Sequence, residues 1–430
     1  MKKIRKINQG GYGVVFEVEL SDGSRVALKE FAPTGVNTAS ELTKLRKRFG
    51  REVKMQKILQ KYGTLPILDE DLTSDPPWFT MPLATQTYIE QIQDDRRDGK
   101  ITSEPLADIL NCLEQIHQRG IVHRDLKPAN ILKLNDQWYL GDLGLVMSPD
   151  LTANTKLTTI GSAYGSIAYM APEQLNDFSH VTFAADIYSF GCILHDLVDG
   201  GVRQPYGVAS TNGKWDPVIR KCTAFDPLSR FASIKALRAV VLQTARKHSN
   251  ITQSPDTIAW TTELENIKTW EPEKFAELAK HVEGESQGSE SGVMAELTAE
   301  HLMIIKSHPE SWFRIGHAYA RWIAAGFTFA FCDVVADRAL TFFDGVEDLE
   351  LKSEIIVGLL QLATYNHRFY VMRECARRMG QELDTFAAER IQIEIQAGEH
   401  EDLLERCVSD LHNHSIEDYH PLLRELIAAA

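Results

Sequence analysis

Apolar and polar residues alternate along the first part of the chain as they do in β-strands. The segment VVFEVEL is followed by RVALKEF, and the residues from Ser21 to Ser24 separate the two. Period-two alternation on both sides of a Gly-containing turn predicts a β-hairpin. A charge-rich helix should follow and end at Gly63, and two short strands are expected around residues 66–72 and 78–83.

From about Thr102 the apolar residues recur with the period of a helix. The residues that share one face are Leu106, Ile109, Leu110, Leu113 and Ile116. The pattern therefore predicts an α+β fold in which a small β-rich lobe, about residues 1–84, precedes a helical lobe, about residues 85–247.

A separate, acidic, all-helical domain is expected beyond residue 247. The polar segment 248–257 predicts a linker, and residues 258–430 have helical periodicity almost throughout. Within them, residues 283–292 carry no apolar anchor and are predicted to form a flexible loop.

Turns near Gly326, Asn366 and Gly398 divide this domain into helix–turn–helix units. Their spacings of 40 and 32 residues bracket the length of helical-hairpin repeats. The domain loosely resembles a tetratricopeptide-like repeat array, and an irregular helical bundle is the alternative.

The two halves of the chain differ in charge. Residues 251–430 contain 15 Lys and Arg against 32 Asp and Glu, although the whole chain has a formal net charge of −14. The simplest interpretation is a solvated helix surface, and the alternative is that this half receives a basic partner. Binding of nucleic acid by so acidic a domain is not expected, because contact with phosphates requires Lys and Arg.

Cysteine usage and hydropathy favour a cytoplasmic location. The six Cys are scattered without a C-x-x-C pair, which is typical of reduced thiols and not of a disulfide framework or a zinc site. No apolar stretch follows the basic N-terminal residues, so no signal peptide is expected. The longest lipid-like run, residues 322–332, is shorter than the roughly 20 residues of a membrane span.

A Gly-rich turn and a buried cation lie close together in the first lobe. The turn is NQGGYGVVF, residues 8–16, and Gly residues let a backbone approach phosphate oxygens and direct N–H groups at them. Lys29 follows on an apolar strand, where an ammonium group requires an acidic partner or an anion. Glu52 of the charge-rich helix is the expected partner, and Glu41 is a rival.

A second polar cluster lies in IVHRDLKPANIL, residues 121–132. It contains Asp125, Lys127 and Asn130, and Asp142 follows in LGDLGLV. The cluster is either a surface turn or a loop that holds a metal and a reacting hydroxyl, because Asp and Asn oxygens suit the hard cation Mg²⁺. A Thr- and Ser-rich segment and then YMAPEQL come next.

Taken in order, these segments resemble the motifs of the eukaryotic-like (Hanks-type) protein kinase family over about residues 4–245. The resemblance implies a bilobal protein kinase fold and transfer of the γ-phosphate of ATP, with Mg²⁺, to a protein. Lys127 is typical of the serine/threonine kinases, so the acceptor should be a Ser or Thr hydroxyl. The Ala-Pro-Glu motif and the long segment before it favour a protein over a small molecule as substrate.

The resemblance also assigns nucleotide-binding residues. Lys29 would bind the α- and β-phosphates and pair with Glu52, and Asn8 replaces the family's usual first Gly. The residues expected around ATP are Asn8, Gly10, Gly11, Gly13, Val15, Ala27, Lys29, Glu52, Met81, Pro82 and Ala84.

Four further residues are expected to carry the transfer. Asp125 would orient the substrate hydroxyl and accept its proton, and Lys127 would contact the γ-phosphate. Asn130 and Asp142 would hold Mg²⁺. The alternative is a nucleotide-binding pseudokinase that acts as a scaffold, but such proteins commonly lack one member of this set.

Other polar residues of the motifs imply architecture and regulation. Asp186 would cap the catalytic-loop backbone, Glu173 would pair with Arg230, and His123 would be a packing residue. Arg124 would pair with a phosphate on the Thr-rich segment and order it. The expected sites of autophosphorylation are Thr155, Thr158 and Thr159.

Beyond its protein substrates, the protein is expected to use the acidic helical domain for contacts. That domain would bind a protein partner, contact the kinase domain, or form a homodimer. No membrane association is expected.

Overall fold

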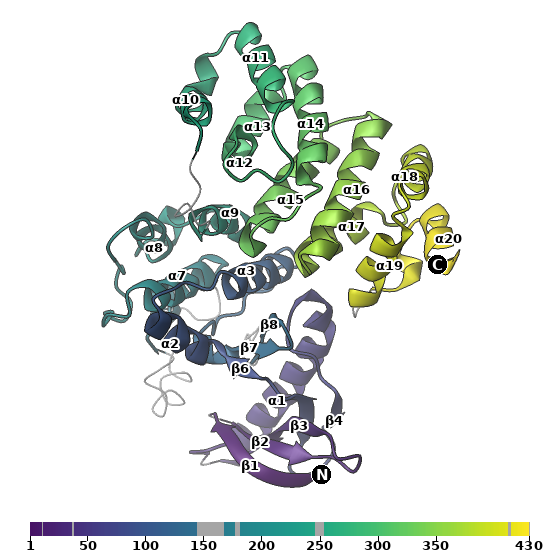
Figure 1. Cartoon of the computed structure of the whole chain (residues 1–430). Coiled ribbons are helices and arrows are strands. Elements are labelled where there is room, and N and C mark those ends of the chain that lie inside the picture. Colours follow the sequence, from purple (N-terminus) through teal and green to yellow (C-terminus); the bar gives the residue numbers. More distant parts are fainter. Residues whose placement is uncertain are drawn as a thin grey trace. The chain divides into compact units, whose positions relative to one another are not determined.

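The computed structural model describes residues 1–10, 12–36, 38–143, 167–176, 181–245, 253–411 and 414–429. The chain divides into two compact units, Met1–Thr244 and Ala245–Ala430 (Figure 1). The first unit has a β-sheet lobe followed by a helical lobe, as predicted, and the second is helical.

An antiparallel sheet forms the first lobe, with its described strands in the order β1-β2-β3-β5-β4. The predicted hairpin is confirmed: β2 and β3 pair so that Val15 lies opposite Lys29. Its turn is closed by Asp22, whose side chain accepts the Ser24 amide at 2.9 Å. The strands are β1 (Lys2–Gln9), β2 (Gly13–Glu19), β3 (Arg25–Phe31), β4 (Asp69–Asp71) and β5 (Trp78–Pro82).

Helix α1 (Ala39–Leu59) packs on this sheet through aromatic residues. Phe49 is fully buried, and its ring centroid lies 5.6 Å from that of Phe31 on β3 and 5.5 Å from that of Phe79 on β5. A capping box between Thr38 and Glu41 satisfies backbone amides at the start of the helix. The segment ends, as predicted, at Gly63, whose φ of 95° is a left-handed conformation that Gly adopts without strain.

The helical lobe is built around α3 and α7. All the residues predicted to share one face of α3 are buried. Strands β6, β7 and β8 form a small second sheet. The elements are β6 (Gln86–Thr87), α2 (Tyr88–Asp98), α3 (Glu104–His117), η2 (Pro128–Asn130), β7 (Ile131–Leu134), β8 (Gln137–Leu140), α6 (Glu173–Asn176), α7 (Ala184–Val198), α8 (Asp216–Cys222), η3 (Pro227–Ser229) and α9 (Ile234–Ala245).

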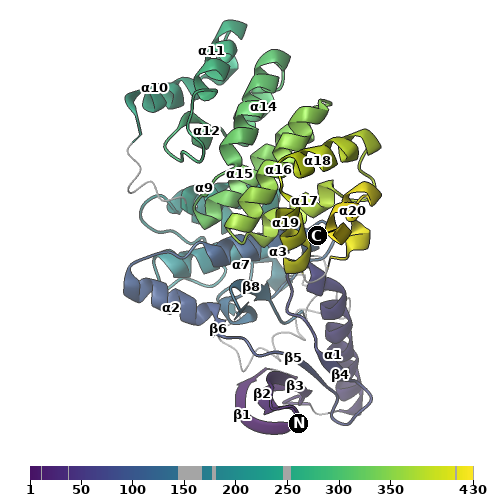
Figure 2. The same cartoon turned by 45° about the vertical axis from the view of Figure 1, so that its right-hand side comes forward.

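The second unit consists of helices that stack in two layers. Helix α14 packs on α16 and α16 on α18, while α15 packs on α17 and α17 on α19 (Figures 1 and 2). The helices are α10 (Pro255–Leu264), η4 (Ile267–Thr269), α11 (Pro272–Val282), α12 (Val293–Glu296), α13 (Ala299–Ile305), α14 (Pro309–Ile323), α15 (Phe329–Phe343), α16 (Leu349–Tyr365), α17 (Phe369–Arg378), α18 (Thr385–Ala397), α19 (Glu401–Asp410), η5 (Ile416–Asp418) and α20 (Pro421–Ala429).

The turns predicted near Gly326, Asn366 and Gly398 fall between these helices, after α14, α16 and α18. Alternate helices that pack on each other are what stacked helical hairpins produce. The resemblance to tetratricopeptide repeats in particular remains a prediction.

Residues 283–292, predicted to form a flexible loop, make hydrogen bonds with residues that come later in the chain. The Gly288 amide donates to the Trp322 carbonyl at 3.0 Å, and the Glu290 carboxylate accepts the Thr328 amide at 2.7 Å. The segment lacks apolar anchors but has hydrogen bonds to later residues. A pattern of apolar residues does not reveal such bonds. The predicted linker, 248–257, lies partly outside the described residues, and its last residues already belong to α10.

All six Cys are buried thiols. Among the helices of the described ranges, none combines the length and the apolar character that crossing a bilayer requires.

Candidate active site

Lys29 lies in the middle of an ionic cluster. Its Nζ is 2.5 Å from Oε1 of Glu52 and 3.5 Å from Oδ1 of Asp142. The Lys29 side chain is 12% exposed and that of Glu52 only 1%. Glu41, the rival partner, is instead engaged in the capping box at Thr38. The hairpin, α1 and the segment after β8 therefore meet at Lys29.

Lys29 and Asp142 stabilise each other's charge, whereas burial and the Asp142 carboxylate raise the pKa of Glu52. Burial alone would lower the pKa of Lys29, but the Asp142 and Glu52 carboxylates outweigh it and raise that pKa, so the ammonium group stays charged. Burial would raise the pKa of Asp142, but the neighbouring Lys29 and Lys127 hold it at about 2. Asp142 is therefore a carboxylate at any physiological pH.

Asp125, Lys127 and Asn130 form a second group, on the loop that leads into η2. The Lys127 ammonium donates to Oδ2 of Asp125 at 2.8 Å. The Asn130 side-chain amide donates to the backbone carbonyl of Asp125 at 2.9 Å. Burial opposes the charge of Lys127, but Asp125 and Asp142 raise its pKa. Carboxylates of both groups therefore stabilise the charge of Lys127.

Asp186 of α7 holds the backbone of this loop, as predicted. Its carboxylate accepts the amides of His123 at 2.8 Å and Arg124 at 2.9 Å. Arg124 has a φ of 67°, a left-handed conformation that is costly for a residue with a side chain. The buried carboxylate stabilises the conformation that turns Asp125 toward Lys127.

His123 is fully buried and joins two segments, which confirms its packing role. Its Nε2 lies 3.2 Å from the Gly141 carbonyl oxygen, and its Nδ1 accepts the Asp125 amide at 3.3 Å. Nε2 must therefore carry the proton. The imidazole ties the loop of Asp125 to the segment of Asp142.

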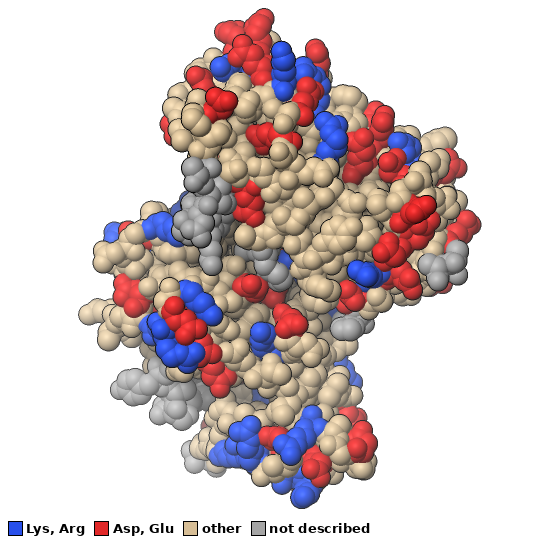
Figure 3. Space-filling view, viewed as in Figure 1, with Lys and Arg blue, Asp and Glu red and all other residues tan. Residues whose placement is uncertain are grey.

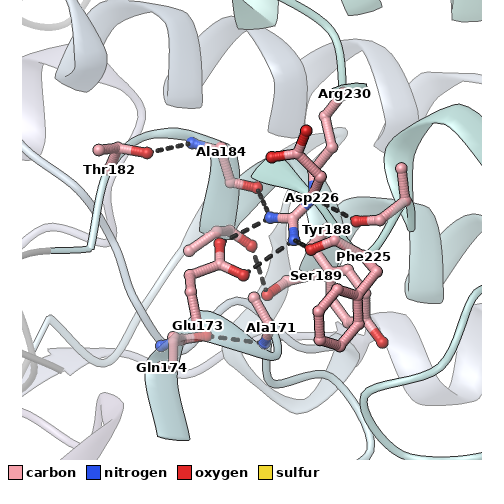
Figure 4. A network of polar contacts seen from close by, with 12 residues as sticks. Ala171, Glu173, Gln174, Thr182, Ala184, Tyr188, Ser189, Phe225, Asp226 and Arg230 are labelled. Atoms are coloured by element: carbon pink, nitrogen blue, oxygen red, sulfur yellow. Dashed lines mark hydrogen bonds and ion pairs between the residues drawn. The ribbon is translucent and has the colours of Figure 1, made fainter. Parts of the chain in front are cut away.

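The predicted ion pair of Glu173 and Arg230 is also present (Figure 4). Two parallel hydrogen bonds of 2.7 and 2.8 Å join the guanidinium and carboxylate groups. Arg230 also donates to the carbonyl oxygens of Ala184 and Ala224, at 2.8 Å each. Nearby, the Gln174 side chain accepts the Ala171 amide and donates to the Arg124 carbonyl. It therefore connects this segment to the loop that contains Asp125.

The Gly-rich turn approaches Lys29 at Gly13. The Gly10 amide donates to the Gly13 carbonyl at 2.8 Å. A Cβ at Gly13 would lie 3.2 Å from the Glu30 carbonyl and 3.4 Å from Cε of Lys29, so the close approach favours Gly. Asn8 lies in β1 opposite Val15. Gly11 lies outside the described residues.

A comparison with known families accounts for this combination of sites. The family model described as a protein kinase domain matches residues 1–236, which is more than half of the chain. The chain belongs to the protein kinase family.

Curated relatives of this chain include bacterial enzymes. It is 32% identical over 193 residues to the serine/threonine-protein kinase AfsK of Streptomyces coelicolor, which covers 44% of this chain and 23% of that one. It is 32% identical over 204 residues to PknH of Mycobacterium tuberculosis, covering 46% and 31%. It is 31% identical over 205 residues to the probable kinase PkwA of Thermomonospora curvata, covering 47% and 26%. The chain thus spans less than a third of the length of each of these relatives.

The residues expected around adenine lie in the first lobe. Ala27 lies opposite Met81 across β3 and β5, and both are buried in one apolar cluster. Val15 packs against the same cluster. Pro82 ends β5, and Ala84 is half-buried after it.

Several residues around this candidate site were not singled out from the sequence. His117 at the end of α3 lies with Nε2 2.8 Å from Oδ2 of Asp186. Tyr12 and Arg48 lie against each other near Lys29. Tyr12 stands inside the Gly-rich motif and Arg48 one helical turn before Glu52, which are the signals that could have found them. The expected phosphorylation sites, Thr155, Thr158 and Thr159, lie outside the described residues.

Proposed function

We propose that the protein is a serine/threonine protein kinase that transfers the γ-phosphate of ATP to Ser or Thr hydroxyls of proteins. The observation that carries the proposal is the assembly of Lys29, Glu52 and Asp142 beside Asp125, Lys127 and Asn130. Each group has the ionic or hydrogen-bonded partner that the family's chemistry requires.

Nucleotide binding is supported by the surroundings of Lys29. Its charge, stabilised by two carboxylates, suits the α- and β-phosphates, and the Gly-rich turn above it can bring backbone N–H groups to the same anion. The apolar cluster of Val15, Ala27 and Met81 suits adenine. Pro82 can offer only its carbonyl, and Ala84 can offer its N–H, which together match the donor and acceptor edges of adenine.

The residues also fit Mg²⁺. The part of the chain that the structure describes holds no group of three or more His, Cys, Asp and Glu side chains arranged for a metal. Mg²⁺ needs no such cage, because it is commonly held by one or two protein oxygens together with substrate phosphates. Asp142 offers an ionised carboxylate, and Asn130 directs its amide nitrogen to Asp125, which leaves its amide oxygen for the cation. Bound Mg²⁺ would neutralise charge on the phosphates.

Transfer then requires little covalent chemistry from the protein. Asp125 orients the substrate hydroxyl, whose oxygen forms a bond to the γ-phosphorus as the bond to the bridging oxygen of ADP breaks. The hydroxyl proton passes to the Asp125 carboxylate. Lys127, 2.8 Å from that carboxylate, contacts the transferred phosphoryl group.

Autophosphorylation of Thr155, Thr158 or Thr159 is part of the proposal. Burial lowers the pKa of Arg124, Asp186 raises it, and the Arg51 guanidinium lowers it again. Two guanidinium groups that repel each other are stabilised by an anion between them. A phosphothreonine supplies that anion and would tie its segment to the catalytic loop and α1.

We assign the acidic helical domain to partner binding or regulation. Acidic side chains are spread over the second unit (Figure 3), and residues 251–430 have more than twice as many Asp and Glu as Lys and Arg. A basic protein surface is the partner of matching charge. A nucleotide-binding scaffold without transfer is the second candidate, and it would keep this binding role.

Transfer of radiolabelled γ-phosphate with Mg²⁺ tests the proposal. The wild type should label itself and a basic protein substrate, and Asp125→Ala and Lys29→Ala should each lower the rate at least a hundredfold. Glu41→Gln, on the same helix as Glu52, is the matched control and should keep activity. Nucleotide binding by a wild type that transfers nothing would favour the scaffold.

A further inference from the structure

Two cations lie over the ring of Tyr12. The guanidinium carbon of Arg48 lies 4.9 Å from the ring centroid, and the ammonium of Lys29 lies 5.5 Å from it. Both distances are within the roughly 6 Å over which a cation is attracted to the face of an aromatic ring. Tyr12 comes from the Gly-rich turn, Lys29 from β3 and Arg48 from α1.

The Tyr12 side chain is turned toward the sheet and α1. Its backbone carbonyl accepts the Ala32 amide at 3.1 Å, which fixes the turn against the end of β3. Its ring packs on the apolar cluster that contains Phe31 and Phe49. Burial and the nearby Glu52 and Asp142 carboxylates raise the pKa of its hydroxyl, so the ring remains neutral at working pH.

Arg48 and Glu52 are four residues apart and so lie on the same face of α1. That face is therefore joined to the sheet lobe twice. Glu52 binds Lys29 directly at 2.5 Å, and Arg48 contacts the Tyr12 ring that also faces Lys29. A shift or rotation of α1 that separates Glu52 from Lys29 would also displace the Arg48 backbone relative to the ring.

We propose that Tyr12 and Arg48 form a clamp that ties the Gly-rich turn to α1 and keeps Glu52 in contact with Lys29. Both are positioning residues, because they act through the Lys29–Glu52 pair. This role rests on the proposed kinase function. It couples the turn that covers the phosphates to the helix that orients Lys29.

Conservative and matched variants separate the clamp from ordinary packing. Tyr12→Phe keeps the aromatic face, whereas Tyr12→Leu keeps apolar bulk without it. Arg48→Met removes the charge and keeps the length of the side chain. Lys47→Met removes the neighbouring, exposed charge of α1 as a control. Tyr62→Leu removes another ring stacked by a guanidinium, that of Arg119 at 3.5 Å, outside the site.

The first measurement is kcat and KM for ATP in full-length protein. Tyr12→Phe, Lys47→Met and Tyr62→Leu should stay within about twofold of wild type in kcat/KM. Tyr12→Leu and Arg48→Met should each lose about tenfold, mostly in kcat, and the double variant should lose no more than either alone. Equal activity of the Phe and Leu variants, or additive losses in the double variant, would overturn the clamp.

A second readout does not depend on phosphoryl transfer. Hydrogen exchange of the α1 amides should quicken about tenfold in Tyr12→Leu and Arg48→Met, and not in Tyr12→Phe or Lys47→Met. If the wild type transfers no phosphate but exchange follows this pattern, the kinase proposal fails and the clamp stands. If transfer is normal and exchange is unchanged in all variants, the clamp fails alone.

Discussion

His117 and Asp186 are joined by a hydrogen bond of 2.8 Å between Nε2 and Oδ2, although 69 residues separate them in the chain. The same Asp186 carboxylate accepts the amides of His123 and Arg124. One buried carboxylate therefore connects α3, the loop that contains Asp125, and α7. The backbone conformation that presents Asp125 depends on it.

The stability supplied by Asp186 should depend on pH. Burial would raise its pKa, but hydrogen bonding and the charge of His117 outweigh that effect and lower the pKa below the ordinary value of 3.8. A lowered carboxyl pKa adds stability above the ordinary value and loses it as the pH falls through the folded-state value.

We therefore expect the difference in unfolding free energy between wild type and Asp186→Asn to shrink as the pH falls below about pH 4. Urea unfolding at a series of pH values from about pH 5 downward measures it. A difference that stays unchanged in acid would show that the Asp186 carboxylate does not control it.

Loss of Glu173 should destabilise the first unit strongly. The Arg230 side chain is fully buried, so Glu173→Ala leaves its charge without an anionic partner and should cost about 3 kcal/mol in unfolding free energy. Arg230→Lys should also be costly, because an ammonium group cannot make the two parallel hydrogen bonds. Denaturant unfolding of both variants checks this, and wild-type stability of Arg230→Lys would contradict it.

The second unit contains a comparable pair. Both side chains of Arg368 and Asp333 are fully buried, and two hydrogen bonds of 2.5 and 2.7 Å join them. Asp333→Asn should cost about 3–5 kcal/mol in unfolding free energy, because it removes the negative charge that compensates the buried guanidinium group. The apolar double variant, Asp333→Leu with Arg368→Met, should cost less.

Glu300→Gln is the control for that measurement, because its partner Lys268 and Glu300 itself are both well exposed. Its unfolding midpoint in urea should not change measurably. A double apolar variant less stable than Asp333→Asn would show that the pair contributes more than charge compensation.

The cysteines should be unreactive in the folded protein. All six are buried, and burial raises the pKa of the Cys192, Cys332 and Cys407 thiols to about 12. A thiolate is the reactive form, so little should form at pH 8. Titration with a thiol reagent should label no Cys in the native protein and six in denaturant. Rapid labelling of one Cys in native protein would identify a segment that opens locally.

The sequence by itself determined the elements whose signals are local. The hairpin of β2 and β3, the end of the first helical segment at Gly63 and the buried face of α3 follow from periodicity and turn chemistry over short segments. The order of the motifs also indicated the family and grouped Lys29 with Glu52, because each motif carries its own residue types at a fixed spacing.

Only the tertiary structure decided which distant side chains meet. The bond between His117 and Asp186 and the buried pair of Arg368 and Asp333 have no local signal, because each depends on how separate elements pack. Residues 283–292 show the same limit. Their composition predicted a flexible loop without apolar anchors, but their backbone amides and carboxylates form hydrogen bonds with residues that come later in the chain.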